Sequence, residues 1–373
     1  MKILHIIPDL QKGGAQRICL DICNELNNKP GIEVLLLNLY PLNEYENLSK
    51  NLKRVICGSR VYPSLSGKTI ADLTDFKNII TKFKPDIIHS HLFEAEILSR
   101  FEVNANIKYI THCHDNMHQL ENMSFKTFKE KKSITNFYEK KLLIKRYKKS
   151  HNRFIAISTD THNYFTRVLP KSFSNRISHL PNAINFEKFF NPNTPEKKSK
   201  IKISSVGSLV DKKNQIFLID VAKILRLRGI DFSIEIFGDG PNRNLISEKI
   251  EKENLKDVIT LHGNIEAVEK HLHDSTLYVH PATYEPFGLA ILEAMAAGLP
   301  VISLDGKGNR DIIENGVNGY IISQKNPLLF AEKIIELINN RDLFEKISNN
   351  AKLNAKKYDI KNYTEKLLQF YKQ

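Results

Sequence analysis

Residues 280–311 read HPATYEPFGLAILEAMAAGLPVISLDGKGNRD. Two prolines in the opening loop disfavour helix, and Gly288 allows the backbone to approach a ligand closely. The segment LAILEAMAAG is expected to be a helix that ends at Gly298. A buried strand, VISL, follows, and the loop DGKGNRD is expected to open onto another helix. Because two glycine-bearing loops flank one buried strand, backbone amides converge there from two sides, which predicts a doubly wound α/β fold with an anion site.

Two glutamates lie eight positions apart in this stretch. Glu285 is in the loop, and Glu293 is about one turn into the helix. Two such residues are usually solvated charges, but here they accompany a helix N-terminus, whose free amides suit a phosphate. A carboxylate at the same end can accept hydrogen bonds from sugar hydroxyls. The pair therefore indicates a site for a nucleotide sugar.

The stretch resembles the E-x7-E signature of the family-4 glycosyltransferases, with Glu285 and Glu293 at the two motif positions. The segment EPFGLAILEAMAAGLPV is similar to that family nearly residue for residue. The resemblance covers essentially the whole chain, more strongly after Ser205. It implies the GT-B architecture, in which two Rossmann-like, doubly wound domains face a central cleft and a C-terminal helix crosses back to the first domain.

The length and the order of segments agree with two domains. A chain of 373 residues exceeds one ordinary core. Short apolar runs alternate with amphipathic segments in both halves, which predicts parallel strands joined by helices. Residues 178–202 interrupt the alternation with three prolines. We expect an acceptor-binding domain over residues 1–180, a donor-binding domain over 181–353, and a C-terminal helix over 354–373 that packs on the first domain.

The charge is concentrated in the first half. Residues 1–180 contain 28 Lys and Arg against 17 Asp and Glu, and the formal charge of the whole chain is +13. Residues 125–149 alone contain ten Lys and Arg, interleaved with aromatic and aliphatic side chains. This pattern favours docking on an anionic membrane surface. A solvated helical face is the alternative, and nucleic acid is disfavoured because no nucleic-acid motif accompanies the charge.

The cysteines and the apolar runs indicate the cellular compartment in which the protein is expected. Four cysteines, at positions 19, 23, 57 and 113, form neither a disulfide framework nor a CxxC pair. No signal peptide is visible, and no apolar run is long enough to span a bilayer. We expect a cytoplasmic protein, peripheral on the inner face of the cytoplasmic membrane.

The resemblance also assigns the diphosphate site. The family pattern is G-R-x4-K, and this chain has Gly207, Ser208 and Lys213 at the corresponding positions. Lys213 is therefore expected on the diphosphate, whereas Ser208 lacks the positive charge of the family's Arg. Either Arg310 or Lys212 is expected to supply that charge instead.

Further donor contacts follow from the same resemblance. Gly13 and Gly14 separate the first strand from the first helix, where glycine lets a loop pass close to a ligand; a plain tight turn is the alternative. His262 and Asn264 follow a strand at the position where the family reads the nucleobase. The full set expected to bind the donor is Gly14, Lys213, His262, Asn264, Phe287, Gly288, Leu289, Glu293 and Arg310.

Four histidines, at positions 89, 91, 112 and 114, end two neighbouring strands. The HxH spacing is compatible with a metal, but no DxD pair occurs, so no metal site and no cofactor beyond the donor substrate is expected. The resemblance places His114 against the donor sugar, and it makes Glu285 and His114 the expected catalytic residues. Gly13, His89, His91 and Asp115 are expected to line the acceptor or sugar, with structural histidines as the alternative.

Together with the resemblance, these features predict a transferase that moves a sugar from a nucleotide diphosphate sugar, UDP-linked, to a hydroxyl acceptor; the resemblance implies that it is retaining. The acceptor expected is a growing or lipid-linked glycan in cell-surface polysaccharide synthesis. Retention could use Glu285 as nucleophile. The resemblance implies instead a reaction on one face of the sugar, with the leaving phosphate as base, and this route is favoured because no second carboxylate is evident. Two alternatives stay open: a sugar-nucleotide epimerase of GT-B-like fold and a non-catalytic membrane-binding module.

Overall fold

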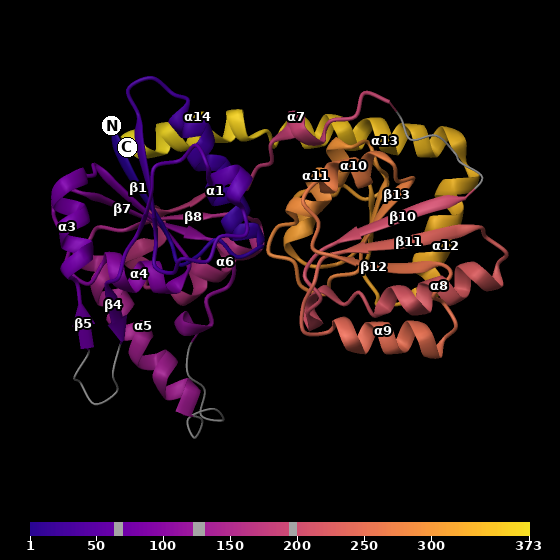
Figure 1. Cartoon of the computed structure of the whole chain (residues 1–373), viewed down its shortest axis with the longest axis horizontal. Helices are drawn as coiled ribbons and strands as arrows, with labels where there is room; N and C mark the ends of the chain where they lie inside the picture. Colours follow the sequence, from indigo (N-terminus) through magenta and orange to yellow (C-terminus); the bar gives the residue numbers. More distant parts are fainter. Residues whose placement is uncertain (63–69, 122–130, 194–199) are drawn as a thin grey trace. The chain divides into compact units, whose positions relative to one another are not determined.

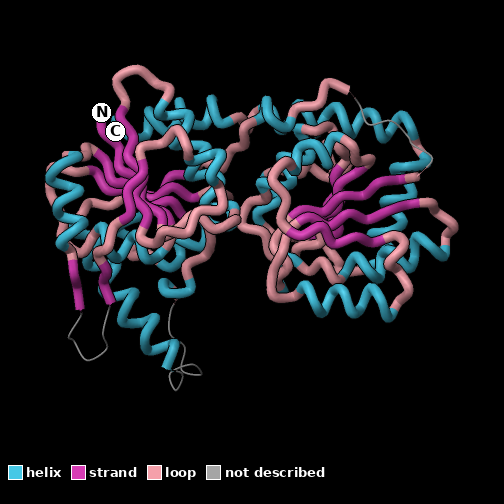
Figure 2. The backbone as a smooth tube through the Cα atoms, in the orientation of Figure 1, coloured by secondary structure: helices cyan, strands magenta, loops and turns pink. Residues whose placement is uncertain are grey.

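The computed structural model describes residues 1–62, 70–121, 131–193 and 200–373. They form two compact units, one of Met1–Asn182 with Tyr363–Gln373 and the other of Ala183–Asn362 (Figure 1). In each unit the strands make a central layer and the helices lie outside it (Figure 2). The predicted class, two open parallel α/β sheets, is confirmed. Residues 354–362, expected in the C-terminal helix segment, belong to the second unit.

The first unit is built on a seven-stranded parallel sheet of order β3-β2-β1-β6-β7-β8-β9. The strands are β1 Lys2–Ile7, β2 Glu33–Asn38, β3 Arg54–Ile56, β6 Ile87–His91, β7 Lys108–Cys113, β8 Arg153–Ala156 and β9 Ile177–His179. The helices are α1 Gly14–Asn27, α2 Glu46–Ser49, α3 Thr74–Phe83, α4 Phe93–Ser99, α5 Lys131–Lys149, α6 Thr159–Val168 and α14 Ile360–Lys372. An antiparallel pair, β4 Arg60–Tyr62 and β5 Ile70–Asp72, lies outside the main sheet.

The two faces of this sheet differ in character. Leu4 and Ile6 of β1 pack into an apolar core with side chains of α3 and α4. His5 points to the opposite face, since successive side chains of a strand alternate. That face carries the histidines and is covered by α14, whose Tyr371 hydroxyl lies 2.6 Å from Nδ1 of His89. The sheet therefore has one apolar face and one face with a polar strip.

The second unit has a six-stranded parallel sheet of order β12-β11-β10-β13-β14-β15. Its strands are β10 Ile201–Val206, β11 Phe232–Phe237, β12 Ile259–Gly263, β13 Leu277–His280, β14 Val301–Leu304 and β15 Tyr320–Ile322. Its helices are α7 Phe186–Phe189, α8 Phe217–Leu227, α9 Arg243–Lys252, α10 Val268–His273, α11 Leu289–Ala296, α12 Pro327–Asn339 and α13 Arg341–Lys356. One continuous apolar core joins the sheet to α8, α9 and α12.

One predicted element is wrong. The loop DGKGNRD does not open onto a helix but forms a short 3-10 turn, Gly308–Asp311, and β15 precedes the next helix. Asn309 explains the difference, because its side chain accepts from the amide of Gly306 at 3.0 Å and donates to the carbonyl of Leu304 at 2.7 Å. These bonds fold the loop back on itself instead of extending a helix.

A buried polar network joins the centre of the first unit. Arg100 is fully buried, and its guanidinium donates to Asn152 at 2.8 Å, Ser90 at 2.7 Å and Thr111 at 3.1 Å. Glu96, also fully buried, accepts from Thr111 at 3.1 Å. Burial raises the pKa of Glu96, and the charge of Arg100 opposes that rise. The network fastens α4 to β6, β7 and β8.

We predict that Arg100→Leu destabilises the first unit by about 3 kcal/mol. The buried carboxylate of Glu96 then lacks its nearby positive charge, and four side-chain acceptors lose their donor: Ser90, Ser99, Thr111 and Asn152. Urea denaturation followed by circular dichroism measures the change. Arg228→Leu is the control: its side chain is 57% exposed, and its change should stay within about 0.5 kcal/mol. Equal effects of the two substitutions would contradict a structural role for the network.

Candidate active site

The most concentrated set of predicted residues lies where the sheet of the second unit changes winding direction. Strands β10 and β13 are neighbours, while β11 continues on one side and β14 on the other. Ligands of open α/β sheets bind beyond the carboxyl ends of the strands at such a switch point. The loop after β10 carries Lys213, and the loop after β13 carries Glu285. The structure thus brings together two residues that are 72 positions apart.

Glu285 is a buried carboxylate with two partners. Its side chain is 10% exposed, and its Oε2 accepts from the ammonium of Lys213 and from Nε2 of His280 at 2.8 Å. Burial alone would raise the pKa of Glu285, but the charge of Lys213 and the hydrogen bond from His280 together hold that pKa well below its usual range. Glu285 is therefore ionised at neutral pH.

His280 was not predicted as a site residue. Burial lowers its pKa and outweighs the opposing effect of Glu285, so the ring is neutral and Nε2 carries the proton that it donates. Its Nδ1 lies 3.2 Å from the hydroxyl of Tyr278. A histidine that ends a strand at a switch point is a sequence signal that could have identified it.

The loops around Glu285 are tied together through their backbones. The amide of Thr283 donates to the carbonyl of Lys212 at 2.9 Å, which joins the loop after β13 to the loop after β10. The amide of Glu285 donates to Gly306 at 2.8 Å, and the amide of Gly308 donates back to Glu285 at 3.0 Å. A Cβ on Gly308 would overlap the carbonyl group of Pro286, so only glycine fits there. The carboxylate is thus held from both sides.

Helix α11 begins directly after this loop. Gly288 precedes it with φ of 114°, a left-handed conformation that favours glycine. Phe287 is 2% exposed, so its amide rather than its ring is suited to a ligand. Leu289 is half-buried at the first helical position, and Glu293 lies one turn further with 8% exposure. The structure therefore places Glu285, Glu293 and the N-terminal amides of α11 on one loop-and-helix segment.

Arg310 does not offer a free positive charge in place of the family's Arg at position 208. Its Nε donates to Asp305 at 2.9 Å, so its charge is already paired within the loop. Lys212 has its ammonium 5.5 Å from the ring centre of Tyr284. Lys212 adjoins Lys213 on the same 3-10 turn, Asp211–Lys213, and is the nearer in sequence of the two expected substitutes.

His262 and Asn264 lie elsewhere on the sheet. His262 pairs with Glu235 and stacks on Phe237 with ring centres 4.7 Å apart. Asn264 is exposed just after β12. Strands β11 and β10 separate β12 from β13, so these two residues are not in the cluster around Glu285.

In the first unit, Gly13 and Gly14 form the turn between β1 and α1. The amide of Gly13 donates to the hydroxyl of Tyr45 at 3.1 Å, and the same hydroxyl donates to the carbonyl of Gly13 at 3.2 Å. Gly14 is the first residue of α1 and is exposed. The turn at the carboxyl end of β1 is therefore fixed by a side chain, with the first amides of α1 beside it.

The histidines of the first unit form one stacked cluster. Strand register sets His5 beside His89 and His91 beside His112. The rings of His112 and His114 stack with centres 4.2 Å apart and planes 9° apart. His5 was not among the predicted site residues, because only the pairing of β1 with β6 brings it into the cluster, from 86 residues away.

Burial differs along this cluster. His89 and His91 are fully buried, so in this structure neither ring reaches a ligand directly, in contrast to the expected acceptor contact. His112 is 2% exposed and lies 3.2 Å from Oδ1 of Asn182. His114 and Asp115 are half-buried and extend beyond β7. His114 is therefore the least buried member of the cluster.

The separation of the ring nitrogens bears on metal binding. Groups of described His and Cys side chains have candidate ligand atoms within 4.8 Å of one another. Two ligands of a tetrahedral zinc ion with bonds of about 2.0–2.1 Å lie roughly 3.3 Å apart. The separations His5–His91, 3.0 Å, and His91–His114, 2.8 Å, are shorter than that. These two contacts have the geometry of hydrogen bonds.

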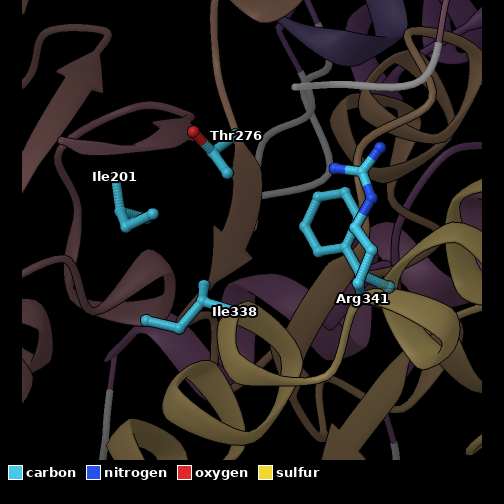
Figure 3. Close-up of a pocket in the computed structure, with 5 residues that line it drawn as sticks. Ile201, Thr276, Ile338 and Arg341 are labelled. Atoms are coloured by element: carbon cyan, nitrogen blue, oxygen red, sulfur yellow. The ribbon is translucent and has the colours of Figure 1, made fainter. Parts of the chain in front are cut away.

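Figure 3 shows a small pocket of the second unit. It is lined by Ile201, Thr276, Ile338, Arg341 and Phe344. Ile201 begins β10 and Thr276 precedes β13, so the pocket is at the amino ends of the strands. Its volume of about 10 Å³ is the lower limit for one water molecule, which excludes a sugar nucleotide.

Two family models match the chain in succession. The model described as Glycosyltransferase Family 4 matches residues 12–188, and the model described as Glycosyl transferases group 1 matches residues 186–354. The two matches meet where the structure passes from its first unit to its second.

Curated relatives include transferases of two bacteria. The chain is 32% identical over 189 residues to a poly(ribitol-phosphate) alpha-N-acetylglucosaminyltransferase of Staphylococcus aureus, which is 50% of this chain but 38% of that protein. It is 25% identical over 360 residues to UDP-Gal:alpha-D-GlcNAc-diphosphoundecaprenol alpha-1,3-galactosyltransferase of Escherichia coli, which covers 92% of this chain and 89% of that protein. The chain thus spans well under half of the first relative and most of the second.

Solved structures share the fold. Anabaena HepE in complex with UDP and glucose superposes with a TM-score of 0.80 at 19% identity and full coverage of both chains. A point mutant of S. aureus TarM in complex with Fondaparinux, alpha-GlcNAc-glycerol and UDP gives a TM-score of 0.76 at 18% identity, again with full coverage of both. At these identities the likeness shows the fold.

We predict energetic coupling between Lys213 and Glu285. Lys213→Met should cost about 3 kcal/mol, because it leaves a buried carboxylate unpaired, and adding Glu285→Gln should recover part of that loss. The exposed pair Arg341–Glu345, with side chains 48% and 44% exposed, is the matched control and should couple by less than about 0.5 kcal/mol. Urea denaturation of the four variants of each cycle measures both couplings, and additive effects at Lys213 and Glu285 would contradict the pairing.

The coupling energy between Lys213 and Glu285 should decrease as the pH falls. The folded-state pKa of Glu285 is lowered, so its stabilising contribution is present above the unfolded value of about 4.3 and is lost as pH falls towards the folded value. The coupling measured at pH 7 should therefore shrink at pH 3. A coupling that grows on acidification would contradict this sign.

Proposed function

This chain belongs to the family-4 glycosyltransferases, and we propose that it is a retaining enzyme that transfers a sugar from a UDP-sugar to a hydroxyl group. The acceptor proposed is a lipid-linked or growing glycan in cell-surface polymer synthesis. The curated relatives named above support this choice, because one is named for a UDP-galactose donor and a diphosphoundecaprenol acceptor and the other for a poly(ribitol-phosphate) acceptor. The epimerase alternative has no such support among them.

The observation that carries the proposal is the buried carboxylate at the switch point of the second unit. Glu285 is ionised and held by Lys213 and His280, next to the first amides of α11. An ammonium has three N–H donors, and one is used by Glu285, so Lys213 can also donate to phosphate oxygens. Positive charge and amides around the diphosphate stabilise the charge that develops on the leaving group.

Glu285 is better suited to positioning than to nucleophilic attack. Its Oε2 accepts two hydrogen bonds, one from a cation, and its pKa is lowered, so its affinity for an electrophilic carbon is reduced. We therefore propose that Glu285 binds hydroxyls of the transferred sugar. The leaving phosphate would remove the acceptor proton on the same face of the sugar, which yields retention without a second carboxylate.

Glu293 is proposed to bind the ribose hydroxyls, since it lies one turn into α11, away from Glu285 along the helix. We predict that Glu293→Gln weakens UDP binding about tenfold, because a charge-assisted hydrogen bond is lost. Isothermal titration with UDP measures the affinity. Glu285→Gln is the matched comparison: it should leave UDP affinity nearly unchanged but remove transfer of the sugar. Equal loss of UDP affinity in both variants would refute the division of roles.

Transfer is proposed to need no metal ion, since Lys213 and the amides of α11 supply the positive charge at the diphosphate. We predict that dialysis against EDTA leaves the transfer rate within about twofold of its starting value. The rate is measured with a UDP-sugar and an undecaprenyl-diphosphate-linked sugar. Full loss of transfer, restored by a divalent ion alone, would overturn this prediction.

We propose that the protein attaches to the membrane through α5, Lys131–Lys149. The segment expected to bind the membrane was 125–149, and its residues 125–130 lie outside the described residues. No described helix is both long enough and apolar enough to cross a bilayer. Leu143 and Tyr147 fasten one face of α5 to the core. The opposite face is exposed at helical spacing and consists of Ile134, Phe137, Lys141, Lys145 and Lys148. A stripe of two apolar residues followed by three cations suits the headgroup region of an anionic bilayer.

We predict that changing Lys141, Lys145, Lys148 and Lys149 to Gln lowers binding to anionic vesicles at least tenfold, since each cation contributes on the order of 1 kcal/mol. Co-sedimentation with vesicles of rising phosphatidylglycerol content measures it, and added salt should weaken wild-type binding. The control changes four exposed lysines of the second unit, Lys252, Lys270, Lys356 and Lys357, to Gln. If both variants bind alike, the stripe is only a solvated face.

A further inference from the structure

Three histidines of the first unit are joined ring to ring in a line. Nδ1 of His5 lies 3.0 Å from Nε2 of His91, and Nδ1 of His91 lies 2.8 Å from Nε2 of His114. The line starts at His5, which is fully buried, and ends at His114, which is half-buried beyond β7. The ring of His89 stacks on His91 and lies tilted against His5, but it is not part of the line.

The protons of this line must all point the same way. Burial lowers the pKa of His5 to about 3 and holds the pKa values of His91 and His114 well below their usual range. At neutral pH each ring therefore has one N–H and one lone pair. His91 uses both nitrogens in the line, so it donates through one and accepts through the other. Either all three rings carry the proton on Nδ1 or all three carry it on Nε2.

The inner end of the line favours Nδ1. Nε2 of His5 is buried and has no hydrogen-bond partner in the described part of the chain. Candidate ligand atoms of His5, Cys19 and Cys23 lie within 4.8 Å of one another. Burial raises the pKa of Cys23, so this thiol keeps its proton. Thiols are donors and only weak acceptors, so these surroundings favour a lone pair on Nε2 over a buried N–H that has no acceptor.

We propose that His5 and His91 are positioning residues that hold His114 as its Nδ1–H tautomer, so that His114 presents a hydrogen-bond donor to its ligand. The tautomer is locked, because reversal requires one proton to leave Nδ1 of His114 and another to enter at Nε2 of His5, which is buried. The use of this donor rests on the proposed function: the N–H would meet a hydroxyl oxygen of the transferred sugar. The tautomer itself does not depend on that function.

The first experiment measures the tautomers directly. Protein with ¹⁵N-labelled histidine is studied at pH 7 by long-range ¹H–¹⁵N correlation, with His114→Gln to assign the signal of His114. We expect Nδ1–H on His5, His91 and His114. Nε2–H on His114 would overturn the proposal.

Variants of His5 then test the line as a unit. His5→Leu removes the inner donor, so His114 should become a mixture of tautomers, whereas the amide of His5→Asn takes the place of Nδ1–H and should preserve Nδ1–H on His114. The matched control is His89→Leu, a buried neighbour outside the line, which should leave the tautomer of His114 unchanged. An effect of His89→Leu as large as that of His5→Leu would mean a general disturbance of the cluster and would overturn the proposal.

Transfer rates test the contact between His114 and the sugar separately from the tautomeric state of His114. With a UDP-sugar donor, His5→Leu should lower kcat/KM about tenfold, the loss of one well-placed hydrogen bond, and His5→Asn should recover most of it. If His5→Leu mixes the tautomers and leaves kcat/KM unchanged, the contact with substrate is refuted. If wild-type protein transfers no sugar from any UDP donor, the proposed function fails while the tautomer result stands on its own.

Discussion

A buried negative charge organises the second unit. Glu285 remains ionised with a side chain only 10% exposed, and burying such a charge is tolerated only when cations and hydrogen bonds replace water. Lys213 and His280 meet that requirement from the ends of β10 and β13, and Gly306 and Gly308 bring a third loop against the backbone of Glu285. The position of each loop is therefore coupled to the others through one carboxylate. A site held in this way suits the proposed reaction, in which catalysis consists of holding a diphosphate and a sugar in place.

Local patterns in the sequence predicted the strands, the loops at their carboxyl ends and the residue types expected at the site. The reason is physical: alternation of apolar runs and turns is a local property, and the switch-point rule locates the functional edge without knowing any contact. Glu285 and Glu293 were candidates on those grounds, whereas Lys213 was assigned to the diphosphate through the family resemblance. The 3-10 turn at Gly308–Asp311 was not predicted, because the side-chain bonds of Asn309 decide it. The short strand β15 was not predicted either, because it is defined by its pairing with β14.

The features of the site that the sequence did not predict depend on contacts between side chains, some of them distant in the chain. The charge of Arg310 is neutralised by its pairing with Asp305, and no sequence motif predicts this pairing. His5 was missed because only strand pairing brings it to His91. His89 and His91 looked accessible as an HxH pair at a strand end, yet α14 and its Tyr371 close over that face. Burial of a polar strip by an element from the other end of the chain cannot be read from a local window.

Helix α14 also constrains the order in which the protein can fold during synthesis. The first unit needs Tyr363–Gln373, and the contact between His89 and Tyr371 joins residues 282 positions apart. The second unit is continuous from Ala183 to Asn362. A ribosome therefore releases every residue of the second unit before the first unit has received its last helix. Until then, the histidine-bearing face lacks the cover of Tyr371, which is buried against His89 in the finished structure. Part of the sheet of the nascent first unit therefore stays open to solvent and to chaperones until Tyr363–Gln373 have been synthesised.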